Sequence, residues 1–143
     1  MLDLDGIKAL LPHREPFLMI DRIEELEPGV RAVGIKEVGH DEFWAKGHFP
    51  GNPVFPGVLL TEALAQVAGV VFLSQSDKYA GTAVYLVGMD KLRFRKPVLP
   101  GQTLRLEVGV DRKRLRIWTF ETVATVDGER VASGTFLATV AEI

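Results

Sequence analysis

The sequence places one histidine and one carboxylic acid where acid–base chemistry is possible. His48 stands in the run Gly47–Gly57, which has three prolines and three glycines in eleven residues and is therefore a loop with a fixed course. Glu62 follows in an apolar segment. An imidazole and a carboxyl group together can move protons at neutral pH. On this pattern alone, catalysis and an ordinary structural role remain equally open for both residues.

The apolar segment from Val58 to about Ser76 predicts a helix that is buried on every side, because apolar residues occupy nearly its whole circumference. Glu62 and Gln66 are four residues apart and so share one face of it. A buried carboxylate without a partner is costly, so Glu62 must find a partner or hold a proton.

The start of this helix offers a third chemical group. Pro56 and Gly57 lead into the helix, so the backbone N–H groups of Gly57 and Val58 are expected to be free at its positive end, where an oxyanion would be stabilised. A base, an acid and an oxyanion site would then lie within fifteen residues of one another, from His48 to Glu62.

Other kinds of chemistry find little support. The chain has no serine-hydrolase elbow, glycine-rich dinucleotide motif, P-loop or zinc-protease motif. It has no cysteine, and its three histidines, His13, His40 and His48, lack the spacing of metal ligands. We therefore expect neither a metal nor a cofactor.

Length and composition predict one soluble, cytoplasmic domain over residues 1–143. A net charge of −2 offers no basic field for nucleic acid, so no nucleic-acid partner is expected. The first residues lack the basic start and apolar run of a signal peptide. Membrane insertion is not expected either, because the apolar segment is shorter than the roughly 18–20 residues of a span and carries Glu62 and Gln66.

The remaining pattern predicts an α+β fold, in which one long helix lies on one face of an antiparallel sheet. Asp127-Gly128 is a strong hairpin signal between the last two strands. A flat sheet cannot cover a helix that is apolar all round, so the sheet should curl and a second copy should cover the rest. We expect a short helix at 5–11, an apolar strand after Pro16 that reaches Ile23, and strands at 30–38, 82–94, 103–110, 117–126 and 130–140.

His13 and Arg14 lie in the proline-bounded loop before the first strand. The simpler interpretation is that they tether this loop to backbone carbonyls or to a neighbouring subunit. A direct part in the chemistry is the alternative.

Residues 47–59 and the sequence Glu62-Ala63-Leu64-Ala65-Gln66 resemble the signature of the FabZ-type (3R)-3-hydroxyacyl-[acyl-carrier-protein] dehydratases. Further motifs similar to those of the family lie at 11–14, 16–18, 21–22, 94–98 and 100–101. The resemblance extends from about Ile7 to the last strand, which is nearly the whole chain.

This resemblance implies a hot-dog fold, in which an antiparallel sheet wraps a central helix, and a homodimer that often assembles further into a homohexamer. It implies a lyase of type II fatty-acid biosynthesis that removes water from (3R)-3-hydroxyacyl thioesters to give trans-2-enoyl thioesters. His48 of one subunit would face Glu62 of the partner subunit. His48 would take the C2 proton, the Gly57 N–H would hold the enolate oxygen, and Glu62 would protonate the departing C3 hydroxyl.

The implied partner is acyl carrier protein bearing a phosphopantetheine-linked acyl chain. Phe55, Val58 and Gln66 are the candidate substrate contacts, and Gln66 is expected to orient the site by hydrogen bonding. Because the carrier is acidic, its docking is expected at a basic surface. The candidates are Arg93, Arg95 and Lys96, at alternating positions near one strand end, with the run 112–114 at an expected hairpin tip as the competitor.

The sequence departs from the family pattern at few positions. Phe55 stands where methionine is usual and Gln102 where aspartate is common, which bears on chain-length preference rather than on the chemistry. Glu62 instead of aspartate and Val58 instead of cysteine distinguish the chain from the FabA-type enzymes, so isomerase activity is not expected.

Two rival functions remain open. One is an acyl thioesterase on the same fold, which would not need His48 in this loop. The other is a non-catalytic acyl-thioester-binding hot-dog protein, which would be expected to carry a DNA-binding extension, and none is expected to fit before Ile7 or after Val140, so the dehydratase is favoured.

Overall fold

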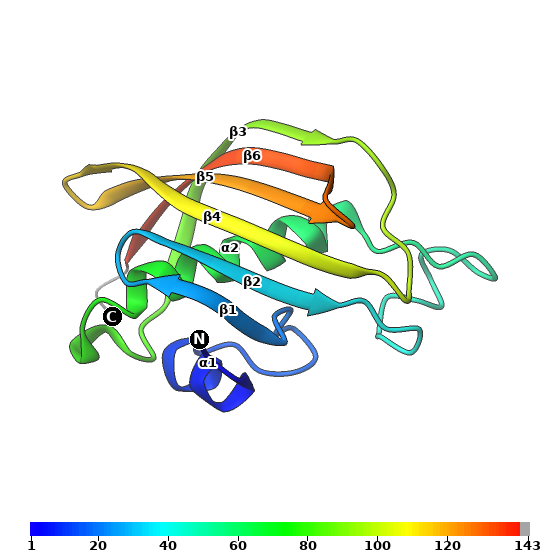
Figure 1. The fold of residues 1–143 in the computed structure, drawn as a ribbon, viewed down its shortest axis with the longest axis horizontal. Coiled ribbons are helices and arrows are strands. Elements are labelled where there is room, and N and C mark those ends of the chain that lie inside the picture. Colours follow the sequence, from blue (N-terminus) through cyan, green and yellow to red (C-terminus); the bar gives the residue numbers. More distant parts are fainter. Residues whose placement is uncertain (141–143) are drawn as a thin grey trace.

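One antiparallel sheet of six strands curls around a single long helix in the computed structural model, which describes residues 1–140 (Figure 1). The strand order across the sheet is β1-β2-β4-β5-β6-β3. In chain order the elements are α1 (Leu4–Leu10), β1 (Arg22–Glu27), β2 (Arg31–Glu37), α2 (Gly57–Leu73), a short 3-10 helix η1 (Asp77–Tyr79), β3 (Val84–Phe94), β4 (Thr103–Arg114), β5 (Ile117–Val126) and β6 (Glu129–Val140). The predicted α+β class is confirmed.

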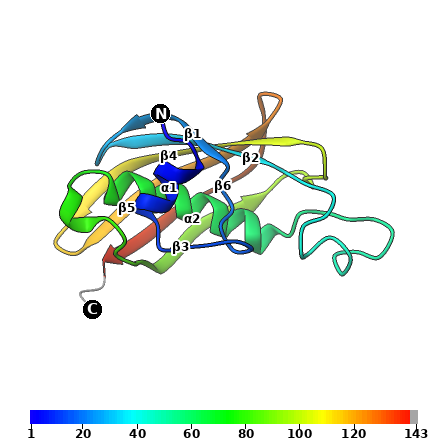
Figure 2. The same cartoon turned by 90° about the horizontal axis from the view of Figure 1, so that it is seen from below.

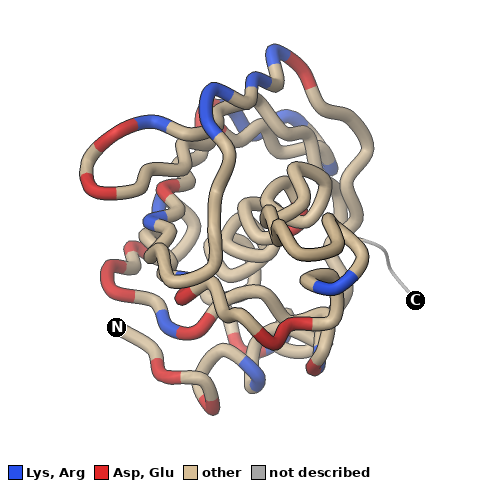
Figure 3. Tube along the Cα trace, turned by 90° about the vertical axis from the view of Figure 1, so that its right-hand side faces the viewer, with Lys and Arg blue, Asp and Glu red and all other residues tan. Residues whose placement is uncertain are grey.

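The core lies between α2 and the concave face of the sheet. Most of α2 is buried, and it packs chiefly against β2 and β4, while α1 lies beside it (Figure 2). The helix approaches β2 closely at Gly34, where an added Cβ would lie only 2.7 Å from the Val67 Cγ2 atom. Figure 3 shows the charged residues around the outside of the molecule, whereas the helix at the centre carries a single charged residue, Glu62.

Two predicted boundaries were wrong in instructive ways. The helix ends at Leu73 rather than near Ser76, and Ser74 caps it through its backbone N–H. The segment before β1 is a loop, so the strand begins at Arg22 instead of just after Pro16. The backbone at Phe17 and Met19 is paired with a side chain of α2, because Phe17 O accepts from and Met19 N donates to Gln66.

The C-terminal meander β4-β5-β6 has the predicted arrangement. Asp127 and Gly128 form its second turn with φ values of 50° and 79°, which is the backbone conformation of a two-residue hairpin turn. β4 extends to Arg114, beyond the predicted end at 110, so the basic residues of 112–114 lie exposed in the paired end of this strand, next to the hairpin tip and not in the turn itself.

β3 is an open edge of the sheet. β6 pairs with one side of it, and no other strand of the described chain pairs with the second side. Its exposed residues include Tyr85, Leu86, Val87 and Met89. A long apolar edge of this kind is a template for association with another chain.

No helix within residues 1–140 is long and apolar enough to cross a membrane.

Candidate active site

The loop that carries His48 holds the imidazole in one orientation. The backbone of His48 is fixed at both groups, since its N–H donates to Trp44 O at 3.0 Å and its carbonyl accepts from Val54 N at 2.7 Å. The ring nitrogen Nδ1 lies 2.8 Å from Val54 O. A carbonyl can only accept, so Nδ1 carries the hydrogen and the neutral ring keeps a free lone pair on Nε2. This is the arrangement that a general base requires.

An ion pair between a buried lysine and a partly exposed glutamate fixes the other end of this loop. Lys36, from β2, is 5% exposed and donates from Nζ to Glu42 Oε1 at 2.8 Å. Glu42 also accepts from Gly39 N at 2.7 Å and from Trp44 Nε1 at 3.3 Å. The Trp44 ring packs against Phe55, with 5.3 Å between ring centroids. The sequence analysis missed this pair, whose only signal was a lysine within an apolar strand.

The start of α2 presents free backbone donors beside this loop. Leu59 N and Leu60 N both donate to Pro56 O, while the N–H groups of Gly57 and Val58 make no hydrogen bond within residues 1–140. The ring of Phe94 covers Gly57 closely, because an added Cβ would lie 3.1 Å from its Cε1 atom. The position therefore suits a residue without a side chain.

His48 and Gly57 line one cavity of about 370 Å³. The end of β3 and the residues that follow it form the other wall. The complete lining is His48, Val54, Phe55, Gly57, Leu60, Phe94, Arg95, Lys96, Pro97 and Val98. The structure thus brings together the predicted base, the predicted oxyanion donor and the predicted substrate contact Phe55.

Glu62 lies in a second cavity of about 280 Å³, farther along α2. Its carboxyl oxygen Oε2 accepts from Gln66 Nε2 at 2.8 Å, and its side chain is 24% exposed in the single chain. Gln66 is 1% exposed. Apolar residues of α2 and the beginning of β3 form most of the wall. The lining is Leu11, Pro12, His13, Glu62, Ala65, Gln66, Gly69, Leu73, Ala83, Val84, Tyr85 and Leu86.

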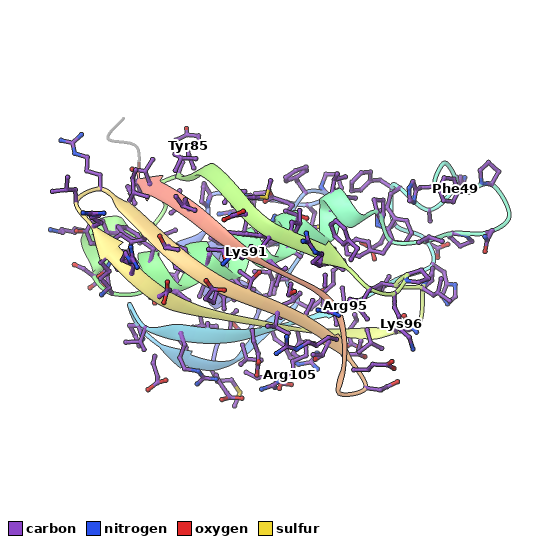
Figure 4. The ribbon with its side chains drawn as sticks, turned by 90° about the horizontal axis from the view of Figure 1, so that it is seen from above. Phe49, Tyr85, Lys91, Arg95, Lys96 and Arg105 are labelled. Carbon is purple, nitrogen blue, oxygen red and sulfur yellow. The ribbon has the colours of Figure 1, made fainter. Side chains whose placement is uncertain are left out.

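One chain does not bring His48 and Glu62 into the same cavity. The His48 cavity meets the end of β3 at Phe94, whereas the Glu62 cavity meets its beginning at Val84. Figure 4 shows this separation, with Tyr85 at one end of β3 and the loop of Phe49 beyond the other. Val58, a predicted substrate contact, lines neither cavity and is 77% exposed.

His13 is a residue of the site that the sequence analysis mainly assigned to tethering. Its Nε2 atom lies 3.5 Å from Glu62 Oε2. Its neighbour Arg14 does tether the loop, because its guanidinium donates to the carbonyls of Lys8, Leu11 and His13. Sequence spacing gave no signal for the contact, since His13 and Glu62 meet only through tertiary structure.

The predicted docking residues are arranged differently from expectation. A bulge between Asp90 and Arg93 breaks the alternation of β3, and the strand ends at Phe94. Arg95 and Lys96 follow the strand and line the His48 cavity. Figure 4 shows the two labelled residues toward the end of the molecule that carries Phe49. Lys96 also pairs with Glu129 at 2.9 Å. Arg93 is exposed, lines neither cavity and donates to Leu92 O.

In the part of the chain that the structure describes, no group of three or more histidine, cysteine, aspartate or glutamate residues is placed to hold a metal ion.

Comparison with known proteins gives consistent matches. Residues 11–135 match the model of the FabA-like domain family. The chain is 54% identical over 134 residues to the 3-hydroxyacyl-[acyl-carrier-protein] dehydratase FabZ of Herpetosiphon aurantiacus, covering 94% of each chain. It is 48% identical over 142 residues to the FabZ of Myxococcus xanthus, covering 99% of this chain and 93% of the other.

A solved structure supports the fold. The dehydratase heterocomplex ApeI:P from Xenorhabdus doucetiae matches with a TM-score of 0.80 at 18% identity, over 95% of this chain and 91% of the other. At that level of identity the match supports the fold alone. The curled sheet around a central helix is the hot-dog fold.

Proposed function

The chain belongs to the FabA-like family, and we propose that it performs its dehydration at an acid–base site built from two subunits. It is an enzyme, a 3-hydroxyacyl-[acyl-carrier-protein] dehydratase of the FabZ type, as its close relatives over nearly the full length are. Its function is the dehydratase step of fatty-acid biosynthesis. What remains to be proposed is how its residues carry out that step.

His48 is the proposed base. Its free Nε2 takes the proton from C2 of the (3R)-3-hydroxyacyl thioester, and the electron pair of that C–H bond delocalises toward the thioester oxygen. The free N–H of Gly57 stabilises the oxyanion that develops there, at the positive end of α2. As the C2–C3 double bond forms, the C3–O bond breaks, and Glu62 of the partner subunit gives the leaving hydroxyl a proton so that it departs as water.

The single observation that carries the two-subunit proposal is the position of the two cavities along β3. The Glu62 cavity lies at its beginning and the His48 cavity at its end. If the open edges of two β3 strands pair antiparallel about a two-fold axis, the beginning of one strand lies beside the end of the other. That pairing sets each His48 cavity against the Glu62 cavity of the partner subunit.

The uncovered apolar surface supports the same pairing. The exposed residues of β3 and Val58 on the free side of α2 would be covered by the second copy. In that position Val58 would border the joint site, which is how it would serve as a substrate contact. Three such dimers in a homohexamer remain part of the proposal.

The acyl chain is proposed to lie in the Glu62 cavity along α2, where Gly69, Leu73 and Leu11 provide an apolar wall. Phe55 borders the side of His48, and Gln66 fixes the carboxyl of Glu62. The phosphopantetheine arm of acyl carrier protein would then enter past Arg95 and Lys96, with Arg93 outside them. The basic hairpin tip at 112–114 is the competing docking surface.

The test is complementation between two inactive variants. Wild-type protein given a 3-hydroxyacyl carrier-protein thioester should form the enoyl product, and His48→Ala and Glu62→Gln should each lower the rate by about 10²–10⁴-fold. Co-expressed heterodimers of the two variants contain one intact composite site and should recover part of the activity. Folded, dimeric mixtures that stay inactive would contradict the shared site, and release of free carrier thiol in place of enoyl product would indicate a thioesterase.

A further inference from the structure

His13 lies against Glu62, yet the proposed reaction gives it no part. The two residues come from different elements, His13 from the loop after α1 and Glu62 from α2. The atoms His13 Nε2 and Glu62 Oε2 are 3.5 Å apart. The loop is held in place by the three backbone carbonyls that the Arg14 guanidinium bonds. The proximity of His13 to the carboxyl is therefore built into the fold.

Gln66 determines which oxygen of Glu62 accepts hydrogen bonds. The N–H of Met19 points at one end of the Gln66 amide at 2.7 Å, so that end must be the oxygen. The amide nitrogen then donates to Phe17 O at 2.9 Å and to Glu62 Oε2 at 2.8 Å. Both N–H donors of Gln66 and one lone pair of its oxygen are used, so its orientation is fixed and Oε2 of Glu62 is the oxygen that accepts from it.

The surroundings of His13 select one neutral tautomer. Its Nδ1 atom is buried and has no hydrogen-bond partner among residues 1–140, and a buried N–H with no acceptor is costly. Its Nε2 atom faces an oxygen that already accepts from Gln66, so a hydrogen on Nε2 is favoured over a lone pair there. The neutral form of His13 therefore carries its hydrogen on Nε2, directed at Glu62.

We infer that His13 is a positioning residue for Glu62, which with Gln66 places two donors on Oε2 so that Oε1 carries the proton delivered to the leaving hydroxyl. The inference rests on the proposed function, because it concerns how Glu62 acts as the acid. It adds that the carboxyl is held in one rotation about its final bond, with one defined oxygen toward the substrate.

Nitrogen NMR of the full chain tests the arrangement without an activity assay. The protein has three histidines, and His13→Gln identifies the signals of His13 by their loss. At neutral pH the His13 ring should show a protonated Nε2 and an unprotonated Nδ1, whereas the His48 ring should show the reverse. A protonated Nδ1 on His13 would overturn the inference.

Kinetics of two matched variants test the positioning role. His13→Leu keeps the side-chain bulk but removes the donor, and His13→Gln keeps an N–H near the position of Nε2. We expect His13→Leu to lower kcat by about 10–100-fold with KM within about twofold, because it loses one hydrogen bond to a charged or proton-bearing group. His13→Gln retains that hydrogen bond, so its kcat should stay within about fivefold of the wild-type value. Equal loss in both variants, or a rise in KM alone, would overturn the inference.

A second background separates this inference from the proposed function. In Glu62→Gln protein, His13→Leu should cause no further loss of kcat, because its effect passes through the carboxyl. A further loss of tenfold or so would show that His13 acts elsewhere. Circular dichroism and elution volume check that every variant is folded. A wild-type chain without dehydratase activity would contradict the proposed function, while the NMR result would still report the His13 arrangement.

Discussion

The two histidines of the site differ in the ring nitrogen that the fold leaves available. Val54 O occupies Nδ1 of His48, so Nε2 is free to accept a proton. At His13 the buried nitrogen is Nδ1 and the outward one faces Glu62. In the neutral form each ring donates from one nitrogen, and of the two it is His48 that lines a cavity with a backbone N–H that makes no hydrogen bond within residues 1–140. Local contacts, rather than residue type, thus separate a base from a positioning group.

At the same scale, the ion pair of Lys36 and Glu42 should control both stability and the base. Glu42→Gln leaves the Lys36 ammonium buried without its counter-charge, so we expect the unfolding free energy to fall by about 1–3 kcal/mol. This loss is at or below the usual cost of breaking a fully buried ion pair, because Glu42 is partly exposed. The dehydration rate should fall as well, because Glu42 holds Gly39 and Trp44, and Trp44 O holds His48. Urea unfolding and steady-state kinetics measure the two effects.

The matched variant for this prediction removes both charges. Lys36→Met combined with Glu42→Gln leaves no uncompensated charge, so its stability should lie above that of Glu42→Gln alone. Equal stability of the single and double variants would mean that the pair does not matter to the fold. A Glu42→Gln protein with normal stability and normal rate would show that the loop is fixed by other contacts.

At the scale of elements, the sequence was informative where structure is decided locally. Prolines and glycines marked the loop of His48, a nearly continuous apolar run marked α2, and alternating apolar residues marked the C-terminal meander, so these elements were predicted, although the ends of α2 and β4 were not. The segment from Phe17 was mistaken for a strand because its backbone pairs with Gln66, which is 47 residues from Met19 and 49 from Phe17. The contact of His13 with Glu62 was missed for a similar reason, since tertiary packing brings the two residues together. Lys36 and Glu42 are close in sequence, but their pairing depends on the course of the loop between them, which the sequence did not specify.

The packing of α2 on β2 depends on the absence of a side chain at Gly34. In Gly34→Ala the new Cβ would stand 2.7 Å from Val67 Cγ2, and the branched valine has little freedom to turn away. We expect a loss of about 1–3 kcal/mol in unfolding free energy, the usual cost of overpacking a core. Thermal or urea unfolding measures it.

Gly109→Ala is the control for this prediction. Gly109 is also a strand glycine, in β4 opposite Arg31, but an added Cβ there meets nothing within 4 Å. Its replacement should leave stability nearly unchanged, because only Gly34 faces the helix. Similar losses in the two variants would point to the strand backbone, and not the helix contact, as the cause.

At the scale of the whole molecule, two surfaces of the sheet have opposite character. The outer face of β1, β2 and β4 carries paired charges, in which hydrogen bonds from Arg31 and then Arg105 hold the pKa of Glu25 below its ordinary value. These pairs are exposed and suited to water. The edge at β3 instead exposes a row of apolar side chains beside unpaired backbone groups. A second copy is therefore expected at β3 and not on the charged face.

This contrast predicts the effect of one charge on assembly and activity together. Val87 is 51% exposed near the middle of β3, and Val87→Lys would put an ammonium group in the proposed interface. We expect a folded monomer by sedimentation, with dehydration reduced by about 100-fold or more because each site would lack the carboxyl of the partner subunit. Leu115→Lys is the control, since Leu115 is 99% exposed at the hairpin tip far from β3 in sequence and should change neither property. A fully active Val87→Lys monomer would mean that one chain closes its own site, and an unchanged oligomer would place the interface elsewhere.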